Sequence, residues 1–300
     1  MSLRRPRAIT ATLALLALAT YAYVRPMSLY FAARKLYLAA IGVRGHDVRV
    51  GSHNIHYLVT GDGPPLVLVH GVAMRADDWA PLYRTLARTH RVYALDLLGY
   101  GGSDKPRDVE YCVGLQSEAV RGFMDALKLQ QADVMGVSMG GWVALKLAAD
   151  HPQRVRKLVL VSSGGFKFDT TLSERSFSAE TIPELRASLL MQSDRADLLP
   201  RFVLRDFLRL SKEKAWVVRS CMRSMLKGDE LLDGKVQRVT MPVLLVWGTA
   251  DRIVPFRVAA AMQREMPQAR VVALEDCGHL AVIECRAEGV PAMIGFLEER

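Results

Sequence analysis

The segment Gly136-Val137-Ser138-Met139-Gly140-Gly141 decides the fold class of this 300-residue chain. An apolar run, Ala132–Val137, leads into it with the composition of a buried β-strand, and a helical pattern over Gly141–Asp150 follows it. A serine placed between a strand and a helix and flanked by glycines predicts a sharp turn that exposes the serine hydroxyl. Ser138 is therefore a candidate nucleophile.

Short apolar, β-branched runs alternate with helical patterns on both sides of this turn. The predicted strands are Val48–Val50, Ile55–Val59, Leu66–Val69, Val92–Leu95, Val134–Val137, Leu158–Val161, Val243–Val246 and Val271–Leu274. The first two form a leading hairpin, and the later runs are typical of strands buried on both faces. This alternation predicts an α/β fold, with a mostly parallel eight-stranded sheet, helices on both faces and functional residues at the carboxyl ends of the strands.

A serine hydroxyl needs a base to accept its proton, and the base needs an acid to orient it. His279 follows the last predicted strand and is the only one of seven histidines well placed to be the base. Asp251 follows the preceding strand and is the predicted acid, whereas Asp276 is too close to His279 along the chain to reach its far nitrogen. Asp96 is expected to pin the loop that follows it.

An acyl-transfer site also needs N–H donors aimed at the developing oxyanion. The backbone N–H of Met139, at the start of the helix after Ser138, is one predicted donor. The second is the N–H of Val72, in the turn His70-Gly71-Val72 after a strand. This chemistry requires no metal ion and no organic cofactor.

Over residues 46–300 the chain resembles the α/β-hydrolase superfamily. The motifs that carry the resemblance are His70-Gly71, Asp78-Trp79, the segment from Asp96 to Asp104, the turn at Ser138, Gly248-Thr249-Ala250-Asp251, and Gly278-His279 with Glu284. Serine at position 138 excludes the aspartate-nucleophile members, such as haloalkane dehalogenases and epoxide hydrolases. Together with the N-terminal segment, the Ser-Met-Gly-Gly turn is similar to membrane-anchored monoacylglycerol lipases and related esterases, although Ala281 stands where many relatives have proline.

About eighty residues separate the strand Leu158–Val161 from the strand Val243–Val246, far more than one crossover needs. Ile182–Met191, Leu198–Leu210 and Lys214–Leu226 have helical periodicity with apolar faces. We interpret residues 166–239 as a helical cap over the active site. Phe166, Phe177 and Met191 are candidate substrate-binding residues.

The net charge of +9 is concentrated at the N-terminus, because residues 1–49 hold eight Lys or Arg and one acid. These charges flank apolar sequence, which indicates anionic lipid and argues against a nucleic-acid partner. Residues 1–45 are predicted to be a membrane anchor, with a span over Ala8–Val24 and an amphipathic helix over Met27–Ile41 whose Arg34 and Lys35 face the head groups. A cleaved signal peptide is the alternative. We expect the N-terminus inside and the catalytic domain on the non-cytoplasmic side.

The four cysteines show no CxxC pair and no spacing typical of a metal site. The favoured interpretation is four free thiols, because free cysteine packs as a small hydrophobe. The alternative is a disulfide between Cys277 and Cys285, on either side of His279, if the domain faces an oxidising compartment.

The sequence therefore predicts a serine hydrolase of carboxylic esters, of lipid or acylglycerol type, that works through an acyl-enzyme on Ser138. Two alternatives stay open. One is a ligand receptor on the same scaffold with little or no catalysis, and the other is a hydrolase of carbon–carbon bonds.

Overall fold

A mixed sheet of eight strands forms the centre of the computed structural model, which describes residues 16–299 without the side chains of residues 195 and 196. The strands are β1 (Arg44–Val50), β2 (His53–Thr60), β3 (Pro65–Val69), β4 (Arg91–Leu95), β5 (Ala132–Val137), β6 (Val155–Val161), β7 (Val243–Gly248) and β8 (Ala269–Leu274). Their order across the sheet is β1-β2-β4-β3-β5-β6-β7-β8, and only the pairs β1–β2 and β2–β4 are antiparallel. The predicted leading hairpin and the mostly parallel sheet are confirmed.

The strand order reverses around β3, which lies between β4 and β5. The chain crosses from β3 to β4 on one side and returns to β5 on the other. At such a reversal the connections leave in opposite directions and open a crevice at the carboxyl ends of the strands. Ser138 directly follows β5 and His70 directly follows β3, so both lie at this crevice.

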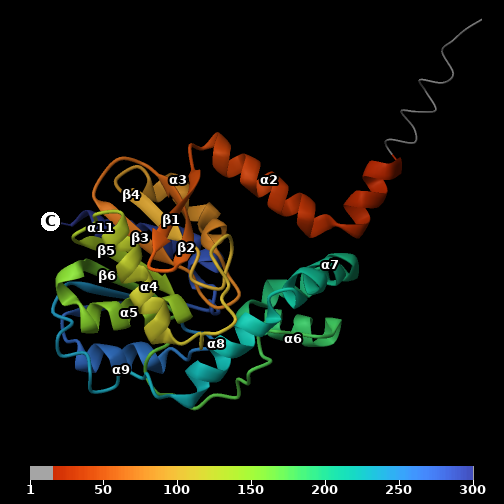
Figure 1. Ribbon diagram of the computed structural model, residues 1–300. Coiled ribbons are helices and arrows are strands. Elements are labelled where there is room, and N and C mark those ends of the chain that lie inside the picture. Colours follow the sequence, from red (N-terminus) through yellow and green to blue (C-terminus); the bar gives the residue numbers. More distant parts are fainter. Residues whose placement is uncertain (1–15, 300) are drawn as a thin grey trace, which may run out of the picture.

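Helices cover both faces of the sheet (Figure 1). From α2 onward the helices are α2 (Pro26–Ala40), α3 (Ala80–Leu86), α4 (Val113–Ala126), α5 (Met139–Asp150), α6 (Ile182–Gln192), α7 (Arg201–Lys212), α8 (Ala215–Lys227), α9 (Arg257–Glu265), α10 (Ala281–Glu284) and α11 (Arg286–Glu298), with 3-10 turns at Ala76–Trp79, Pro152–Arg154 and Asp194–Leu198. Those that pack on the faces of the sheet include α3, α4, α5, α9 and α11. Side chains alternate between the faces along β3: Val67 and Val69 join the core with α4, α5 and α9, and Leu66 and Leu68 join the core with α3 and α11. The period of two places a hydrophobic layer on each side of the sheet.

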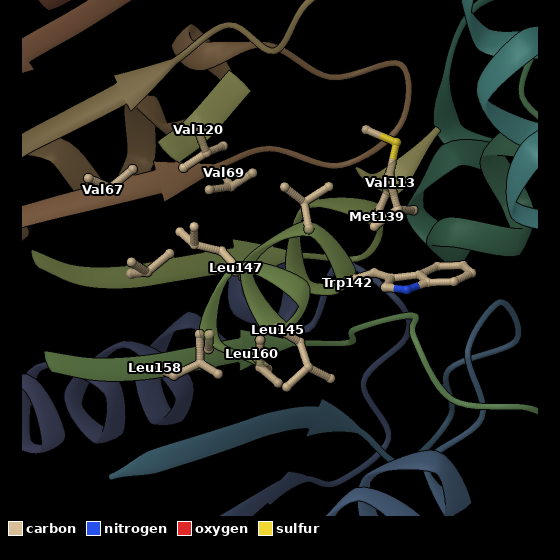
Figure 2. Close-up of a cluster of buried hydrophobic side chains, with 14 of the residues drawn as sticks. Val67, Val69, Val113, Val120, Met139, Trp142, Leu145, Leu147, Leu158 and Leu160 are labelled. Atoms are coloured by element: carbon tan, nitrogen blue, oxygen red, sulfur yellow. The ribbon is translucent and has the colours of Figure 1, made fainter. Parts of the chain in front are cut away.

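The helix that begins after Ser138, α5, is the most deeply buried helix, with ten of its twelve residues inside the core. Figure 2 shows its side chains among those of β3, α4 and β6. The labelled residues are Val67, Val69, Val113, Val120, Met139, Trp142, Leu145, Leu147, Leu158 and Leu160. Because protein cores are close-packed, this contact fixes the start of α5, and with it the position of Ser138.

The long segment between β6 and β7 contains the three predicted helices as α6, α7 and α8, which lie to one side of the sheet (Figure 1). One predicted boundary is wrong. The helix expected from Leu198 begins at Arg201, because Pro200 has an extended backbone (φ −62°, ψ 148°) and serves as the N-cap. Leu198 is 82% exposed and does not contribute to the apolar face of α7.

The N-terminal part of the described chain consists of a helix over residues 16–24 and α2. The predicted span Ala8–Val24 begins outside the described residues. Within residues 16–299, the structure contains no helix with both the length and the apolar character needed to span a bilayer. Both helices touch α7. Tyr23 of the first helix stacks on Phe202 with ring centroids 5.1 Å apart, and the N–H of Met27, at the start of α2, donates to Asp206 Oδ2 at 3.0 Å.

The amphipathic helix expected over Met27–Ile41 is present as α2, but the predicted direction of Arg34 is wrong. Its guanidinium faces the domain, 2.8 Å from Asp77 Oδ1 and 2.7 Å from Asp78 Oδ1, and the side chain is 8% exposed. Two carboxylates on a neighbouring turn provide a partner that the local sequence does not reveal. Lys35, one position further, is exposed as expected.

Candidate active site

The turn after β5 holds Ser138 in the left-handed region of backbone space, with φ 55° and ψ −120°. A non-glycine residue is uncommon there and is strained. The strain is balanced by hydrogen bonds: the N–H of Ser138 donates to Val161 O at 2.9 Å, and its carbonyl accepts from Gly141 N at 3.0 Å. The sequence motif therefore folds into the sharp turn that it predicted.

The glycines of the motif are required by close backbone approach. A Cβ atom at Gly140 would collide with the carbonyl oxygens of Val69 and His70, and one at Gly136 would collide with the backbone of Gly140. On the opposite side, a Cβ atom at Gly71 would lie 3.3 Å from Ser138 Cβ. The end of β3 is thus pressed directly against the turn that carries Ser138.

Asp251 and His279 form a buried hydrogen-bonded pair at the ends of β7 and β8. Asp251 Oδ2 lies 2.8 Å from His279 Nδ1, and the two side chains are 0% and 5% exposed. The other carboxylate oxygen, Oδ1, accepts from the N–H groups of Ile253 at 2.8 Å and Val254 at 3.0 Å. Because the carboxylate oxygen can only accept a hydrogen bond, His279 Nδ1 must carry the ring proton and donate it to Asp251. The other ring nitrogen, Nε2, is then able to accept a proton.

The loop that carries His279 is held on both sides. Cys277 and Cys285 form a disulfide, so the interpretation of four free thiols is wrong for this pair and holds for Cys112 and Cys221. Spacing alone could not show that the short helix α10 turns the chain back and brings positions 277 and 285 together. Inside the bridged loop, the N–H of Gly278 donates to a carboxylate oxygen of Glu284 at 3.0 Å.

Ser138 and His279 line one small cavity together with Gly71, Val72 and Phe177. The three residues predicted as a catalytic group, Ser138, Asp251 and His279, therefore lie at one edge of the sheet. Asp276, the rival acid, is exposed and its N–H bonds to Thr249 Oγ1.

The two predicted oxyanion donors belong to backbone beside Ser138. Met139 is the first residue of α5, where an N–H has no acceptor one turn earlier within the helix. Val72 follows the end of β3, and both residues line the same pocket as Ser138. The positive end of the α5 dipole points toward this position, which favours a negative charge there.

An apolar pocket of about 420 Å³ opens beside Ser138. Its walls come from the start of α5, the segment after β6, α8 and the loop after β7. They include Trp142, Gly164, Gly165, Phe166, Phe168, Leu172, Phe177, Met222, Met225, Leu226, Leu231, Ile253 and Val254, together with two charged residues, Lys167 and Lys227. Of the predicted substrate residues, Phe166 and Phe177 line this pocket and Met191 does not. Met191 lines a separate small cavity beside Arg252 and Gly278.

Trp142 also lines this pocket, although it was not among the predicted substrate residues. It lies four positions after Ser138, which is one helical turn, so it shares the face of α5 nearest Ser138. Its indole N–H donates to Glu230 O at 3.1 Å and ties α5 to the segment between β6 and β7. The spacing from Ser138 could have identified it.

His70 and Asp96 support the site without belonging to its reactive part. Asp96 accepts from Ala76 N and Gly102 N, each at 2.7 Å, and so pins the following loop as predicted. His70 Nδ1 bonds to Gly71 O at 2.8 Å, and His70 Nε2 accepts from Leu97 N at 3.0 Å. Burial lowers the pKa of His70, so the neutral ring is the stable form.

The described residues contain no group of three or more His, Cys, Asp and Glu side chains placed to hold a metal ion.

Family models match most of the chain. One described as the alpha/beta hydrolase fold matches residues 64–224, and one described as TAP-like protein matches residues 208–299. Together they cover the strands β3 to β8, the segment between β6 and β7, and all the residues of the candidate site.

Among the similar proteins of known name are hydrolases of two kinds and an acetyltransferase component of an acetoin cleaving system. The chain is 31% identical to the pimeloyl-[acyl-carrier protein] methyl ester esterase of Nitrosomonas europaea, over 75% of this chain and 92% of the relative. It is 29% identical to the 2-hydroxymuconate semialdehyde hydrolase of Pseudomonas sp. strain CF600, over 80% of this chain and 89% of the relative. The crystal structure of a membrane phospholipase A, a bacterial virulence factor, superposes with a TM-score of 0.84 at 27% identity and 98% coverage of both chains.

Proposed function

We propose that this chain, which belongs to the alpha/beta hydrolase fold family, cleaves carboxylic esters through an acyl-enzyme on Ser138. One observation carries the proposal. The buried Asp251–His279 pair and the strained Ser138 turn meet at one small cavity, and Ser138 also lines an apolar pocket.

In the proposed mechanism, His279 Nε2 takes the proton of Ser138 Oγ as the oxygen attacks the ester carbonyl. The carbonyl oxygen becomes an oxyanion, which the N–H groups of Val72 and Met139 stabilise. The ester C–O bond then breaks, and the imidazolium returns its proton to the departing alcohol. A water molecule then attacks the acyl-enzyme while His279 accepts its proton. The bond from the acyl carbon to Ser138 Oγ breaks, the imidazolium returns the proton to Ser138 Oγ, and the acid is released. Asp251 orients the ring and stabilises its charged form throughout.

The apolar pocket supports a lipid-derived acyl group as the substrate. Its volume of about 420 Å³ lies within the usual range for small-molecule sites, and most of its walls are aliphatic or aromatic. The resemblance to a phospholipase and to an acyl ester esterase agrees with this class. Medium-chain and long-chain p-nitrophenyl esters should be turned over faster than the acetate. Faster turnover of the acetate would contradict a lipid substrate.

Carbon–carbon bond hydrolysis is the second candidate, because a relative of similar identity is a 2-hydroxymuconate semialdehyde hydrolase. The two activities are separated by assaying a dienoic ketoacid and a p-nitrophenyl ester side by side. We expect the ester to be the better substrate by kcat/KM.

The test of the nucleophile is Ser138→Ala. Turnover of the p-nitrophenyl ester and labelling by a fluorophosphonate probe should both disappear. Ser162→Ala is the matched control, because Ser162 is a fully buried serine with positive φ at the end of the adjacent strand β6. Retained labelling in Ser138→Ala would overturn the assignment, and failure of the wild-type protein to label would favour a receptor role.

Attachment to a membrane through the N-terminal segment is part of the proposal. Large apolar side chains are exposed along residues 16–40, namely Leu16, Leu18, Tyr21, Tyr23, Val24, Tyr30, Leu36 and Tyr37. Tyrosine favours the bilayer interface, and exposed apolar surface of this kind is typical of membrane contact. The Cys277–Cys285 disulfide supports a catalytic domain on the oxidising, non-cytoplasmic side. Flotation with liposomes, with and without residues 1–40, tests the attachment.

A further inference from the structure

A second cavity, larger than the pocket at Ser138, lies between α2 and the β1–β2 hairpin. Its volume is about 660 Å³, and it shares no lining residue with the pocket at Ser138. The apolar part of its wall comes from Phe31 and Leu38 of α2, Val43 before β1 and Leu58 of β2. We call this cavity the α2 groove.

The acidic side chains in the wall of the α2 groove, Asp77 and Asp96, already have ion-pair or hydrogen-bond partners. Asp77 lies 2.8 Å from the guanidinium of Arg34 and 2.7 Å from that of Arg75. Asp96 accepts two backbone N–H bonds, from Ala76 and Gly102. Asp77 is therefore neutralised by two guanidinium groups, and both carboxylate oxygens of Asp96 are occupied by backbone donors.

Two cations in the same wall have no acidic partner among residues 16–299. Lys35 is exposed and has neither an ion pair nor a hydrogen bond there, and Arg44 donates only to the backbone carbonyls of Ala39 and Val43. His56, also in the wall, is bonded to Asp47 at 2.8 Å. The α2 groove thus combines an apolar wall with two cations that form no ion pair with any described residue.

The outer side of α2 is itself apolar and aromatic. Tyr30, Leu36 and Tyr37 are 53%, 72% and 46% exposed, on the helix that forms one wall of the α2 groove. A helix with apolar and tyrosine side chains turned to solvent is suited to the head-group region of a bilayer. A lipid at that depth would have its phosphate beside the cations and its chains beside apolar wall residues.

We propose that the α2 groove binds a membrane phospholipid with an anionic head group, with the phosphate at Lys35 and Arg44 and an acyl chain along Phe31, Leu38 and Leu58. Basic pockets beside membrane helices recognise anionic lipids in this way. The site rests on the proposed membrane attachment, but it is independent of the chemistry at Ser138. Its role is to select anionic membrane and to seat α2 on it.

The test uses the full chain carrying Ser138→Ala, so that added lipid is not hydrolysed, in non-ionic detergent micelles. Dioleoylphosphatidylglycerol is titrated in, and bound lipid is counted by native mass spectrometry. We expect Lys35→Gln/Arg44→Gln to weaken binding by about 25-fold, or about fivefold for each charge near a lipid surface. Ala32→Trp, which fills the α2 groove without changing charge, should weaken binding at least tenfold.

Arg49→Gln/Arg88→Gln is the matched control, because both arginines are exposed, lie outside the α2 groove and give the same change in net charge. This variant should stay within twofold of the parent. Dioleoylphosphatidylcholine should bind at least tenfold more weakly, and glycerol phosphate at 1 mM should not displace the lipid. Unchanged binding in both groove variants, equal loss in the control, equal affinity for the two lipids, or displacement by glycerol phosphate would each overturn the proposal.

A separate measurement distinguishes this site from the proposed catalytic function. With Ser138 intact, Lys35→Gln/Arg44→Gln should hydrolyse p-nitrophenyl butyrate in detergent at the wild-type rate. A failure of the catalytic assignment would show in the Ser138→Ala comparison, and a failure of the lipid site would show only in the binding titration.

Discussion

Replacing Asp251 by asparagine tests the proposed catalytic geometry most directly, because the structure dictates how the new side chain must orient. Oδ1 of Asp251 accepts two backbone N–H bonds, from Ile253 and Val254. An asparagine must place its carbonyl oxygen there, since an NH₂ group would face two donors and leave them unsatisfied. The NH₂ group then faces His279 Nδ1, which must become an acceptor. The ring proton moves to Nε2, and His279 can no longer accept the proton of Ser138.

The expected loss is that of a triad whose base is held in the wrong tautomer, about 10⁴-fold in kcat. That factor corresponds to about 5 kcal/mol of transition-state stabilisation. The melting temperature should change little, because the backbone N–H groups keep their acceptor and no volume is lost.

Initial rates on a p-nitrophenyl acyl ester, with active sites counted by a fluorophosphonate, give kcat for the Asp251→Asn variant. Asp276→Asn is the control, because Asp276 is an exposed acid only three positions before His279. It should keep the wild-type rate to within about twofold. The reasoning fails if Asp251→Asn keeps more than a tenth of the activity, or if Asp276→Asn loses as much as Asp251→Asn.

Three further perturbations test the stability of the structure around the site. Gly140→Ala should destabilise the fold by about 1–3 kcal/mol, because the added methyl group meets the carbonyl oxygen of His70. Gly295→Ala, in open space on α11, should be neutral or stabilising, and urea unfolding compares the two variants. Replacing Cys277 and Cys285 together by serine should lower stability by about 2.5 kcal/mol, the chain-entropy value for so short a loop, and an unchanged melting temperature would contradict a structural role for the disulfide. Burial lowers the pKa of His70 below its ordinary value of 6.5, so below pH 6.5 the His70 ring binds a proton more readily in the unfolded chain than in the folded one. The free energy of unfolding should therefore fall as the pH drops below 6.5, by at most about 1.4 kcal/mol per pH unit. In urea unfolding between pH 7 and 5, His70→Asn should have the shallower slope, and an identical slope would show that another group is responsible.

Local rules were enough to predict much of this molecule. A strand, a glycine-flanked serine and a helix can meet in few ways, so the turn at Ser138 followed from its own neighbours. The strands were recognised because a sheet buried on both faces demands continuous apolar runs. Asp251 and His279 could be placed because residues that follow parallel strands come to the same edge of a sheet, however far apart they are in sequence.

Contacts between segments distant along the chain escaped prediction where no repeating pattern encodes them. The spacing of apolar residues predicted α6 to α8, but not which side chains face Ser138, so Met191 was expected in the pocket and Trp142 was not. The partners of Arg34 belong to a turn more than forty residues away.

The amino-acid sequence was sufficient to predict the fold class, the turn at Ser138 and the edge of the sheet at which the candidate site lies, because each depends on local periodicity or on strand direction. The shape of the apolar pocket beside Ser138, the pairing of Cys277 with Cys285 and the α2 groove became visible only in three dimensions. These features arise where separate elements pack together. Such packing depends on shape and charge complementarity between surfaces, and neither surface is visible in the segment that forms the other.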